Sequence, residues 1–156
     1  MNSRVRTFLT ARHIAFDAIP HAEAFTAQET AAASHIAGRH VAKTVIIEVD
    51  GDLAMAVIPA DSMVDIERFR RLVGARSAQL SSEGRFAGAF PDCEPGAMPP
   101  FGNLYGVEVA MERQLAADDV IAFNAGDHTE LVRLASSDFS ELEHPIVRDF
   151  VAPLPS

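Results

Sequence analysis

The sequence lacks tryptophan and has a single cysteine, Cys93, among its 156 residues. One cysteine cannot form an intramolecular disulfide, so the cysteine content gives no sign of an oxidising compartment. Long apolar runs are also missing. The longest, 53–58, is far too short to cross a bilayer, and the first 16 residues contain no signal-peptide core. We therefore expect neither export nor membrane insertion, and the cytoplasm is the predicted location.

Several familiar catalytic motifs are absent as well. The six histidines form no H-E-x-x-H pattern, and the sequence contains no C-x-x-C, G-x-S-x-G or G-x-x-x-x-G-K-[ST] segment. These absences argue against a metal site, an α/β serine hydrolase and a nucleotide hydrolase, and no cofactor is expected. Asp92 and Glu94 flank Cys93, and their charges should raise the pKa of its thiol, which argues against a catalytic cysteine.

Positive charge is scarce, since 13 cationic residues face 22 anionic ones and the net charge is −9. The first 43 residues carry +2, which leaves −11 on the rest. A protein that holds nucleic acid mainly through its phosphates needs the opposite balance. DNA binding is therefore not expected, and any contact with RNA should be small and local.

The composition, 48% hydrophobic and 22% charged, is that of a globular chain, and we expect one domain over residues 1–156. Periodicity and capping signals predict helices over 3–13, 31–36, 66–73, 82–90 and 137–142, the first capped by Ser3 and the second by a T-x-x-E box at Thr26. Strands are predicted over 14–19, 41–49, 53–58, 77–80, 104–109, 120–123 and 130–134. Prolines 145, 153 and 155 indicate a frayed end. The order of these elements predicts an α+β fold with a mixed sheet.

Two of the predicted strands, 41–49 and 53–58, flank Asp50-Gly51-Asp52, which is typical of a hairpin turn. Both strands are apolar on both faces, as in strands that are covered on both sides. We therefore place this hairpin at the centre of the sheet.

The loop 96–102, with the sequence Gly-Ala-Met-Pro-Pro-Phe-Gly, can be neither helix nor central strand because its prolines lack amide donors and fix φ. Its end glycines allow sharp turns, so the amides of Gly96, Ala97 and Met98 could face a ligand. The loop is then either a wall of a binding site or an ordinary proline-stiffened connection.

Four segments together resemble a known family: this loop, Ala42-Lys43-Thr44, Phe123 to Gly126 followed by His128, and the strand 131–134. In order and spacing they are similar to the YbaK/prolyl-tRNA-synthetase-associated family of aminoacyl-tRNA editing domains, over about residues 28–150. The resemblance implies hydrolysis of the ester that joins a wrong amino acid to the 3′ end of tRNA. It also implies a curved or bifurcated, barrel-like mixed sheet with helices packed on it.

Under this resemblance, Lys43 is an electrostatic anchor for the substrate and His128 positions a water or serves as a base. Lys43 is the only lysine among the cationic residues, which favours a need for a compact ammonium. The alternatives are a snorkelling surface lysine and a solvated histidine in a turn. The substrate-binding residues would be Thr44, Gly96, Ala97, Met98, Pro99, Pro100, Phe101, Gly102 and Gly126.

Two functions follow. The first is a free-standing deacylase that edits a small amino acid in trans; its partner is the 3′ end of mischarged tRNA, with an aminoacyl-tRNA synthetase as a further candidate. The second is a non-catalytic module of the same fold that binds an aminoacyl or nucleotide ligand. Lys43 and the intact proline loop favour catalysis, whereas the acidic composition favours binding alone.

Overall fold

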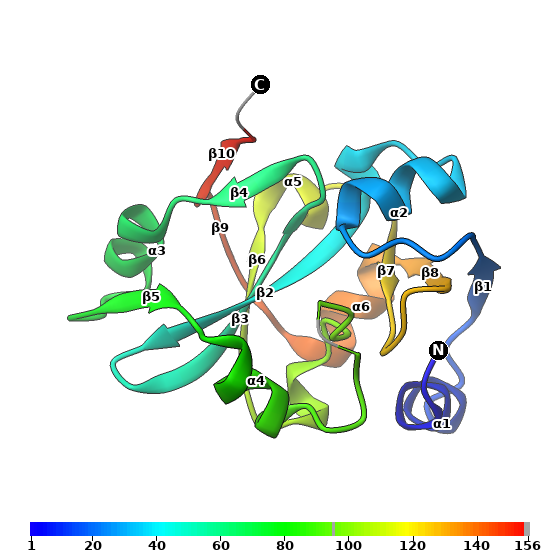
Figure 1. Cartoon of the computed structure of the whole chain (residues 1–156), viewed down its shortest axis with the longest axis horizontal. Coiled ribbons are helices and arrows are strands. Elements are labelled where there is room, and N and C mark those ends of the chain that lie inside the picture. Colours follow the sequence, from blue (N-terminus) through cyan, green and yellow to red (C-terminus); the bar gives the residue numbers. More distant parts are fainter. Residues whose placement is uncertain (95, 155–156) are drawn as a thin grey trace.

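The computed structural model describes residues 1–94 and 96–154 (Figure 1). The helices are α1 (Ser3–Ala11), α2 (Ala27–Ser34), α3 (Ile66–Val73), α4 (Glu83–Ala89), α5 (Arg113–Ala116) and α6 (Ser136–Glu143), with 3-10 turns η1 (Gly38–His40) and η2 (Gly102–Leu104). The strands are β1 (Phe16–Pro20), β2 (Val41–Val49), β3 (Asp52–Pro59), β4 (Ser62–Val64), β5 (Ala78–Leu80), β6 (Glu108–Glu112), β7 (Val120–Asn124), β8 (Glu130–Ala135), β9 (Ile146–Arg148) and β10 (Val151–Pro153). None of these helices is long and apolar enough to cross a bilayer.

The main sheet has the order β1-β8-β7-β2-β3-β6-β9, with β5 paired to β2 (Figure 1). Strand β2 runs antiparallel to β3 but parallel to β7, and β6 runs parallel to both β3 and β9. The predicted mixed sheet is confirmed, and the hairpin of β2 and β3 lies at its centre as expected. A second, two-stranded sheet joins β10 to β4.

The turn between β2 and β3 follows from its sequence. Asp50 and Gly51 both adopt positive φ, at 50° and 88°, and this left-handed pair matches the twist of the flanking strands. The Asp50 carboxylate accepts hydrogen bonds from the amides of Arg76 and Ser77, both at 2.9 Å. The turn therefore also fixes the chain that leads into β5.

The two faces of β2 belong to different parts of the core. Ala42 and Ile46 lie in the larger cluster, to which α1 and α6 also contribute. Ile47, on the opposite face, packs in a second cluster with Phe69 of α3 and Phe150. Because both faces are covered, the apolar character of the hairpin strands is explained by burial on both sides.

Local capping signals predicted the helix ends with mixed success. Thr26 caps α2 by accepting the amide of Glu29 at 3.1 Å, which confirms the capping box, although α2 begins at Ala27 and ends before the left-handed His35. The first helix is capped by Asn2 and not by Ser3, because the Asn2 side chain accepts the amide of Val5 at 3.0 Å.

Two predictions near the C-terminal half were wrong. The segment 104–109 is not one strand, because the amides of Tyr105 and Val107 both bond back to the carbonyl of Gly102 and close a turn before β6 begins. The expected frayed end is instead ordered, since β9 pairs with β6 and β10 pairs with β4. Of the prolines that suggested fraying, Pro153 ends β10, and Pro155 lies outside the described residues.

Candidate functional site

The candidate site begins where β2 and β7 part. These parallel strands pair over two positions only, Val41 with Ala122 and Ala42 with Phe123. The next residues in this register are Lys43 and Asn124, and β7 ends at Asn124. Ligand sites often form at the carboxyl ends of parallel strands, where neighbouring strands diverge and leave a crevice.

Strand alternation assigns each of these side chains to a face. Val41 and Ala122 pack against Ala31 of α2. Since side chains two residues apart point to the same face, Lys43 and Asn124 lie on the face that α2 covers. Thr44, which was predicted to bind substrate beside Lys43, lies on the opposite face with the core residue Ala42. The structure therefore separates these two predicted site residues.

Lys43 is half-buried, and its Nζ donates a hydrogen bond to the carbonyl of Ala60 at 3.4 Å. Burial lowers the pKa of this ammonium below its ordinary value, and the nearby carboxylate of Asp61 opposes part of the shift. The Nζ thus points toward the connection between β3 and β4. The hydrogen bond of Lys43 is therefore made to this connection and not to the proline loop.

His128 follows β7 in the turn before β8, and it is only 3% exposed, so the alternative of a solvated turn histidine was wrong. Its ring lies 5.2 Å from the ring of Phe25, centroid to centroid. Gly96 is its neighbour on another side: a Cβ added there would lie 3.6 Å from Cε1 of His128. The fold therefore brings together His128 and the first residue of the proline loop.

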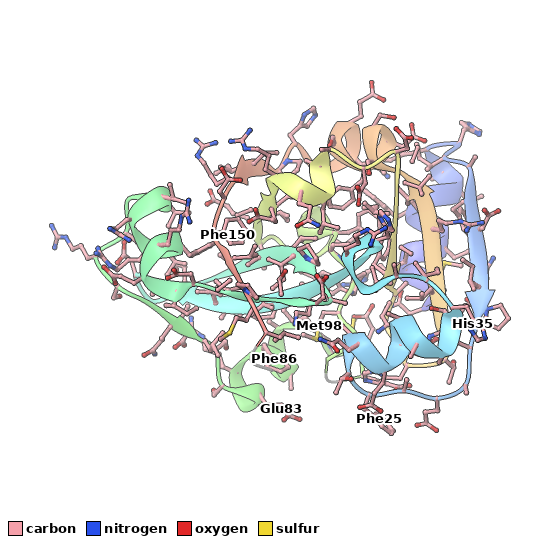
Figure 2. All side chains as sticks on the ribbon, turned by 90° about the horizontal axis from the view of Figure 1, so that it is seen from above. Phe25, His35, Glu83, Phe86, Met98 and Phe150 are labelled. Carbon is pink, nitrogen blue, oxygen red and sulfur yellow. The ribbon has the colours of Figure 1, made fainter. Side chains whose placement is uncertain are left out.

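The rest of the proline loop is part of the core. Ala97 to Gly102 are buried, and the Phe101 ring packs on Phe8, Phe123 and Phe139. The Ala97 amide donates to the carbonyl of Glu94 at 3.0 Å, so the expected spare amide at this position was wrong. Figure 2 shows Met98 pointing into the interior of the molecule, and its side chain is 6% exposed. The side chains of Met98 and Phe101 therefore stabilise the fold and are not accessible to a ligand.

Gly126 connects this loop to the N-terminal segment. Its amide donates to the carbonyl of Ala97 at 2.8 Å, and its φ of +102° favours glycine. A Cβ at this position would lie 2.5 Å from Nδ2 of Asn2. The close approach of Asn2 is enough to require glycine at this position, even without a ligand. The fold alone can therefore explain the glycine of the Phe123 to Gly126 segment.

Two polar residues near Lys43 were missed by the sequence analysis. Oδ1 of Asn124 and Oγ1 of Thr30 are buried without a hydrogen-bond partner among the described residues, and Thr30 is completely buried on α2. Buried polar atoms normally have partners, because an unsatisfied one costs stability. The Phe-Asn-Ala-Gly segment could have indicated Asn124, whereas no signal in the sequence indicated Thr30.

Cys93 does not serve this site. Its Sγ lies 3.3 Å from the Tyr105 hydroxyl, which donates to Asp92 at 3.0 Å. Burial raises the pKa of the thiol to about 11; the hydrogen bond with Tyr105 opposes this shift and the Asp92 charge adds to it. The predicted direction is confirmed, but burial and not the acidic neighbours is the main cause. Within the described residues, no group of three or more His, Cys, Asp or Glu side chains could hold a metal ion.

A buried carboxylate supports the end of the proline loop. Both oxygens of Glu143, at the end of α6, lie 3.3 Å from the amide of Asn103, and the Asn103 side chain donates to the carbonyl of Leu142 at 2.8 Å. Burial raises the pKa of Glu143 to about 7, against a smaller opposing effect of the Asn103 hydrogen bond. This contact fastens η2, which directly follows the loop, to α6.

The Glu143→Gln variant should change how stability depends on pH. Because the folded pKa is raised to about 7 from an ordinary 4.5, the contribution of Glu143 is fully present below pH 4.5 and is lost as pH rises through 7. Glutamine still accepts the Asn103 amide but does not titrate. The variant should therefore gain stability relative to wild type between pH 4.5 and 8, by up to about 3 kcal/mol. Chemical denaturation across this pH range measures the difference, and parallel curves for the two proteins would contradict it.

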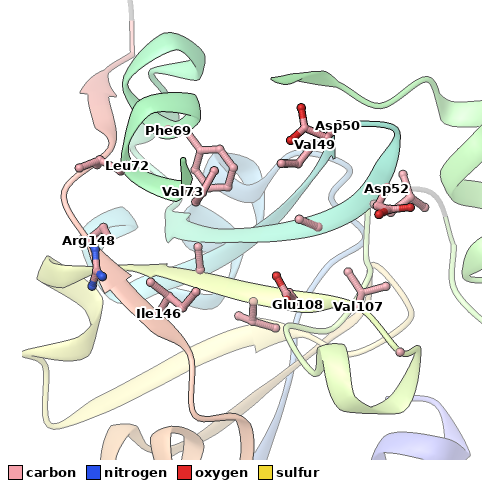
Figure 3. A pocket seen from close by; sticks show the side chains of 15 residues that line it. Val49, Asp50, Asp52, Phe69, Leu72, Val73, Val107, Glu108, Ile146 and Arg148 are labelled. Carbon is pink, nitrogen blue, oxygen red and sulfur yellow. The ribbon is translucent and has the colours of Figure 1, made fainter. Parts of the chain in front are cut away.

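A cavity of about 710 Å³ lies elsewhere, between α3 and strands β3, β6 and β9 (Figure 3). Figure 3 shows Leu72 and Ile146 on its apolar walls and Arg148 at its margin. None of the predicted site residues lines it. A large volume alone does not indicate chemistry, so we locate the candidate site at Lys43 and His128.

Comparison with known proteins identifies the family to which the chain belongs. Residues 21–142 match the model of the aminoacyl-tRNA editing domain. Among solved structures, a hypothetical protein, APE2540, is similar with a TM-score of 0.86 and 19% identity, over 96% of this chain and 100% of that one. A proposed trans-editing enzyme for prolyl tRNA synthetase is similar with a TM-score of 0.81 and 18% identity, over 96% of this chain and 95% of that one. At this identity the likenesses establish the fold alone. A search of curated proteins found no significant match.

Proposed function

Because the chain belongs to the aminoacyl-tRNA editing domain family, we propose that it is a deacylase that acts in trans. It hydrolyses the ester between a small, wrongly attached amino acid and the 3′ end of tRNA. The observation that carries this proposal is the placement of Lys43, the only lysine, on the face of the sheet that α2 covers, directly after the last paired position of β2 and β7.

In this proposal Lys43 stabilises negative charge. Water adds to the carbonyl carbon of the ester, the bond to the 3′ oxygen breaks, and that oxygen leaves with a proton. The ammonium of Lys43 is partly desolvated, so its attraction for a phosphate or a developing oxyanion is stronger than in water. Asn124 supplies a buried carbonyl oxygen that can accept a hydrogen bond from the substrate amine.

His128 has a positioning role in this scheme. Its ring is held between Phe25 and Gly96, where it can orient the attacking water or the 2′-hydroxyl of the terminal ribose. Because His128 is only 3% exposed, its ring can contact only a substrate group that is itself buried in the site.

The proposed preference for a small amino acid follows from the general limits of binding. A hydrophobic pocket separates side chains that differ by one methylene by only about 1–3 kcal/mol, so a second hydrolytic site improves fidelity. The residues of α2 that are buried toward the sheet are Thr30 and Ala31, both small. Small side chains on the helix that covers this face suit a substrate with a compact side chain.

The family implies an interaction with tRNA, and the net charge of −9 implies that it is confined to the acceptor end. We propose the cytoplasm as its location because mischarged tRNA is produced there. The likeness to a proposed trans-editing enzyme for prolyl tRNA synthetase makes a synthetase a further candidate partner.

The second candidate function is binding of an aminoacyl or nucleotide ligand without hydrolysis. It is favoured by the burial of His128 and by the hydrogen bond that holds Lys43 to Ala60. A panel of mischarged tRNAs separates the two functions, because only a deacylase releases the amino acid faster than the uncatalysed reaction.

A further inference from the structure

Phe25 is the most exposed large apolar side chain of the described residues, at 64%. Figure 2 shows it at the edge of the molecule, close to α2 and away from the sheet. An exposed aromatic ring forgoes the favourable free energy of burial. The position of this ring therefore suggests a contact that is made only when another molecule is bound.

One part of the ring already has a partner. Phe25 and His128 lie 5.2 Å apart between ring centroids, with 58° between their planes. Because His128 is nearly buried while Phe25 is mostly exposed, Phe25 covers the histidine and presents its remaining surface to solvent. Phe25 thus lies on the surface directly over His128.

Hydrogen bonds hold the backbone on both sides of Phe25. Before it, the amide of Ala24 donates to the carbonyl of His128 at 3.3 Å. After it, Thr26 caps α2. The Phe25 carbonyl also lies 3.9 Å from where a Cβ on Gly96 would be, so the proline loop is a direct neighbour. A backbone held in this way loses little conformational freedom when a ligand stacks on the Phe25 ring.

We propose that Phe25 is a stacking platform for the nucleobase at the 3′ end of tRNA. This inference rests on the proposed function, because it places the terminal nucleotide at Phe25 and the amino acid farther in, toward Lys43. Unstacked bases at RNA ends are commonly bound on aromatic side chains. Stacking also suits a chain with a net charge of −9, which gains little from phosphate contacts.

The absence of tryptophan allows a direct test by fluorescence. The Phe25→Trp variant has a single tryptophan, and titration with the RNA trinucleotide CCA should quench its emission in a saturable way. Leu80→Trp is the matched control, because Leu80 is 61% exposed on β5, outside the candidate site. It should show no saturable quenching, and a trinucleotide whose terminal base is removed should not quench the emission of the Phe25→Trp variant.

A kinetic test separates stacking from a structural role. Phe25→Ala should reduce kcat/KM on mischarged tRNA about 10- to 100-fold, mainly through KM, and Phe25→Tyr should stay within about threefold of wild type. Phe25→Leu keeps most of the apolar volume but no aromatic ring, and should behave like alanine. On an aminoacyl ester without a nucleobase, Phe25→Ala should lose much less activity than on mischarged tRNA, because only its contact with His128 is then lost.

The outcomes separate this inference from the proposed function. Hydrolysis of mischarged tRNA with no quenching in Phe25→Trp and no effect of Phe25→Ala would overturn the stacking role alone. Saturable quenching by CCA in a protein that hydrolyses none of the mischarged tRNAs would support the stacking role and overturn the deacylase.

Discussion

Alanine in place of Lys43 is expected to abolish deacylation and to leave the fold intact. The loss follows from the proposed role of Lys43, because no other lysine exists in the chain and an ammonium on the central strand β2 can stabilise charge without reorganisation. Lys43→Arg should recover little, since a guanidinium is longer, planar and differently directed. Single-turnover deacylation by wild type and both variants is the measurement.

The fold should survive because Lys43 does not stabilise it much. Burial lowers the pKa of the ammonium, which means that folding disfavours its charged form. Lys43→Met keeps the length of the side chain and removes the charge, so it serves as the matched control for lost packing. It should melt like wild type and be as inactive as Lys43→Ala. Wild-type rates in either variant would remove Lys43 from the mechanism.

The second large effect is expected from Gly102→Ala, and it is an effect on stability. A Cβ at Gly102 would lie 2.1 Å from the carbonyl oxygen of Val107 and 2.6 Å from Cγ2 of Val109. The oxygen cannot easily retreat, because the Val107 amide bonds to the Gly102 carbonyl and closes this turn. We expect a loss of about 3 kcal/mol or more, which for a chain of this size lowers Tm by roughly 6–12 °C.

Gly88→Ala provides the control for Gly102→Ala. Gly88 lies in α4, and a Cβ there would meet nothing within 4 Å. Alanine in a helix restricts the unfolded chain, so this variant should be neutral or more stable by about 0.4–1 kcal/mol. Thermal melting of both variants gives the comparison. A Gly102→Ala protein that melts with wild type would show that the turn adapts.

Gly102 also illustrates how a correct residue can be chosen for an incomplete reason. The sequence suggested that both glycines of the proline loop provide freedom in φ. Gly96 does adopt a positive φ of +82°, but Gly102 is required for space. The clash partner, Val107, lies within the segment that the sequence pattern had assigned to a strand. A close backbone approach of this kind leaves no periodic signal.

Much of the fold could be predicted because the relevant signals are local. The Asp-Gly turn, the Thr26 capping box and the Asp65–Gly74 limits of α3 each depend on residues within one or two turns of chain. The strands β9 and β10 were missed because they are three residues long and depend on partners far away in the sequence. Nothing in their own composition overrides the neighbouring prolines.

Residues for the candidate site could be proposed from the sequence, but their geometry could not. Lys43 and His128 were found through a family pattern, whereas the face to which Lys43 points depends on where α2 packs. Phe25 and Asn124 escaped notice because their importance comes from contacts with His128 and with the β2–β7 junction. The amides of the proline loop were expected to face a ligand, but most of the loop is buried in the hydrophobic core.

We propose to test ester hydrolysis with a panel of tRNAs charged with wrong and correct small amino acids. Deacylation of each tRNA is the measurement. Each charged tRNA is followed under single-turnover conditions with wild type, Lys43→Ala and no protein. Wild type should release at least one wrong amino acid far faster than the uncatalysed reaction, and Lys43→Ala should not. Saturable binding of every mischarged tRNA with release only at the uncatalysed rate would contradict ester hydrolysis and leave the chain a binding module.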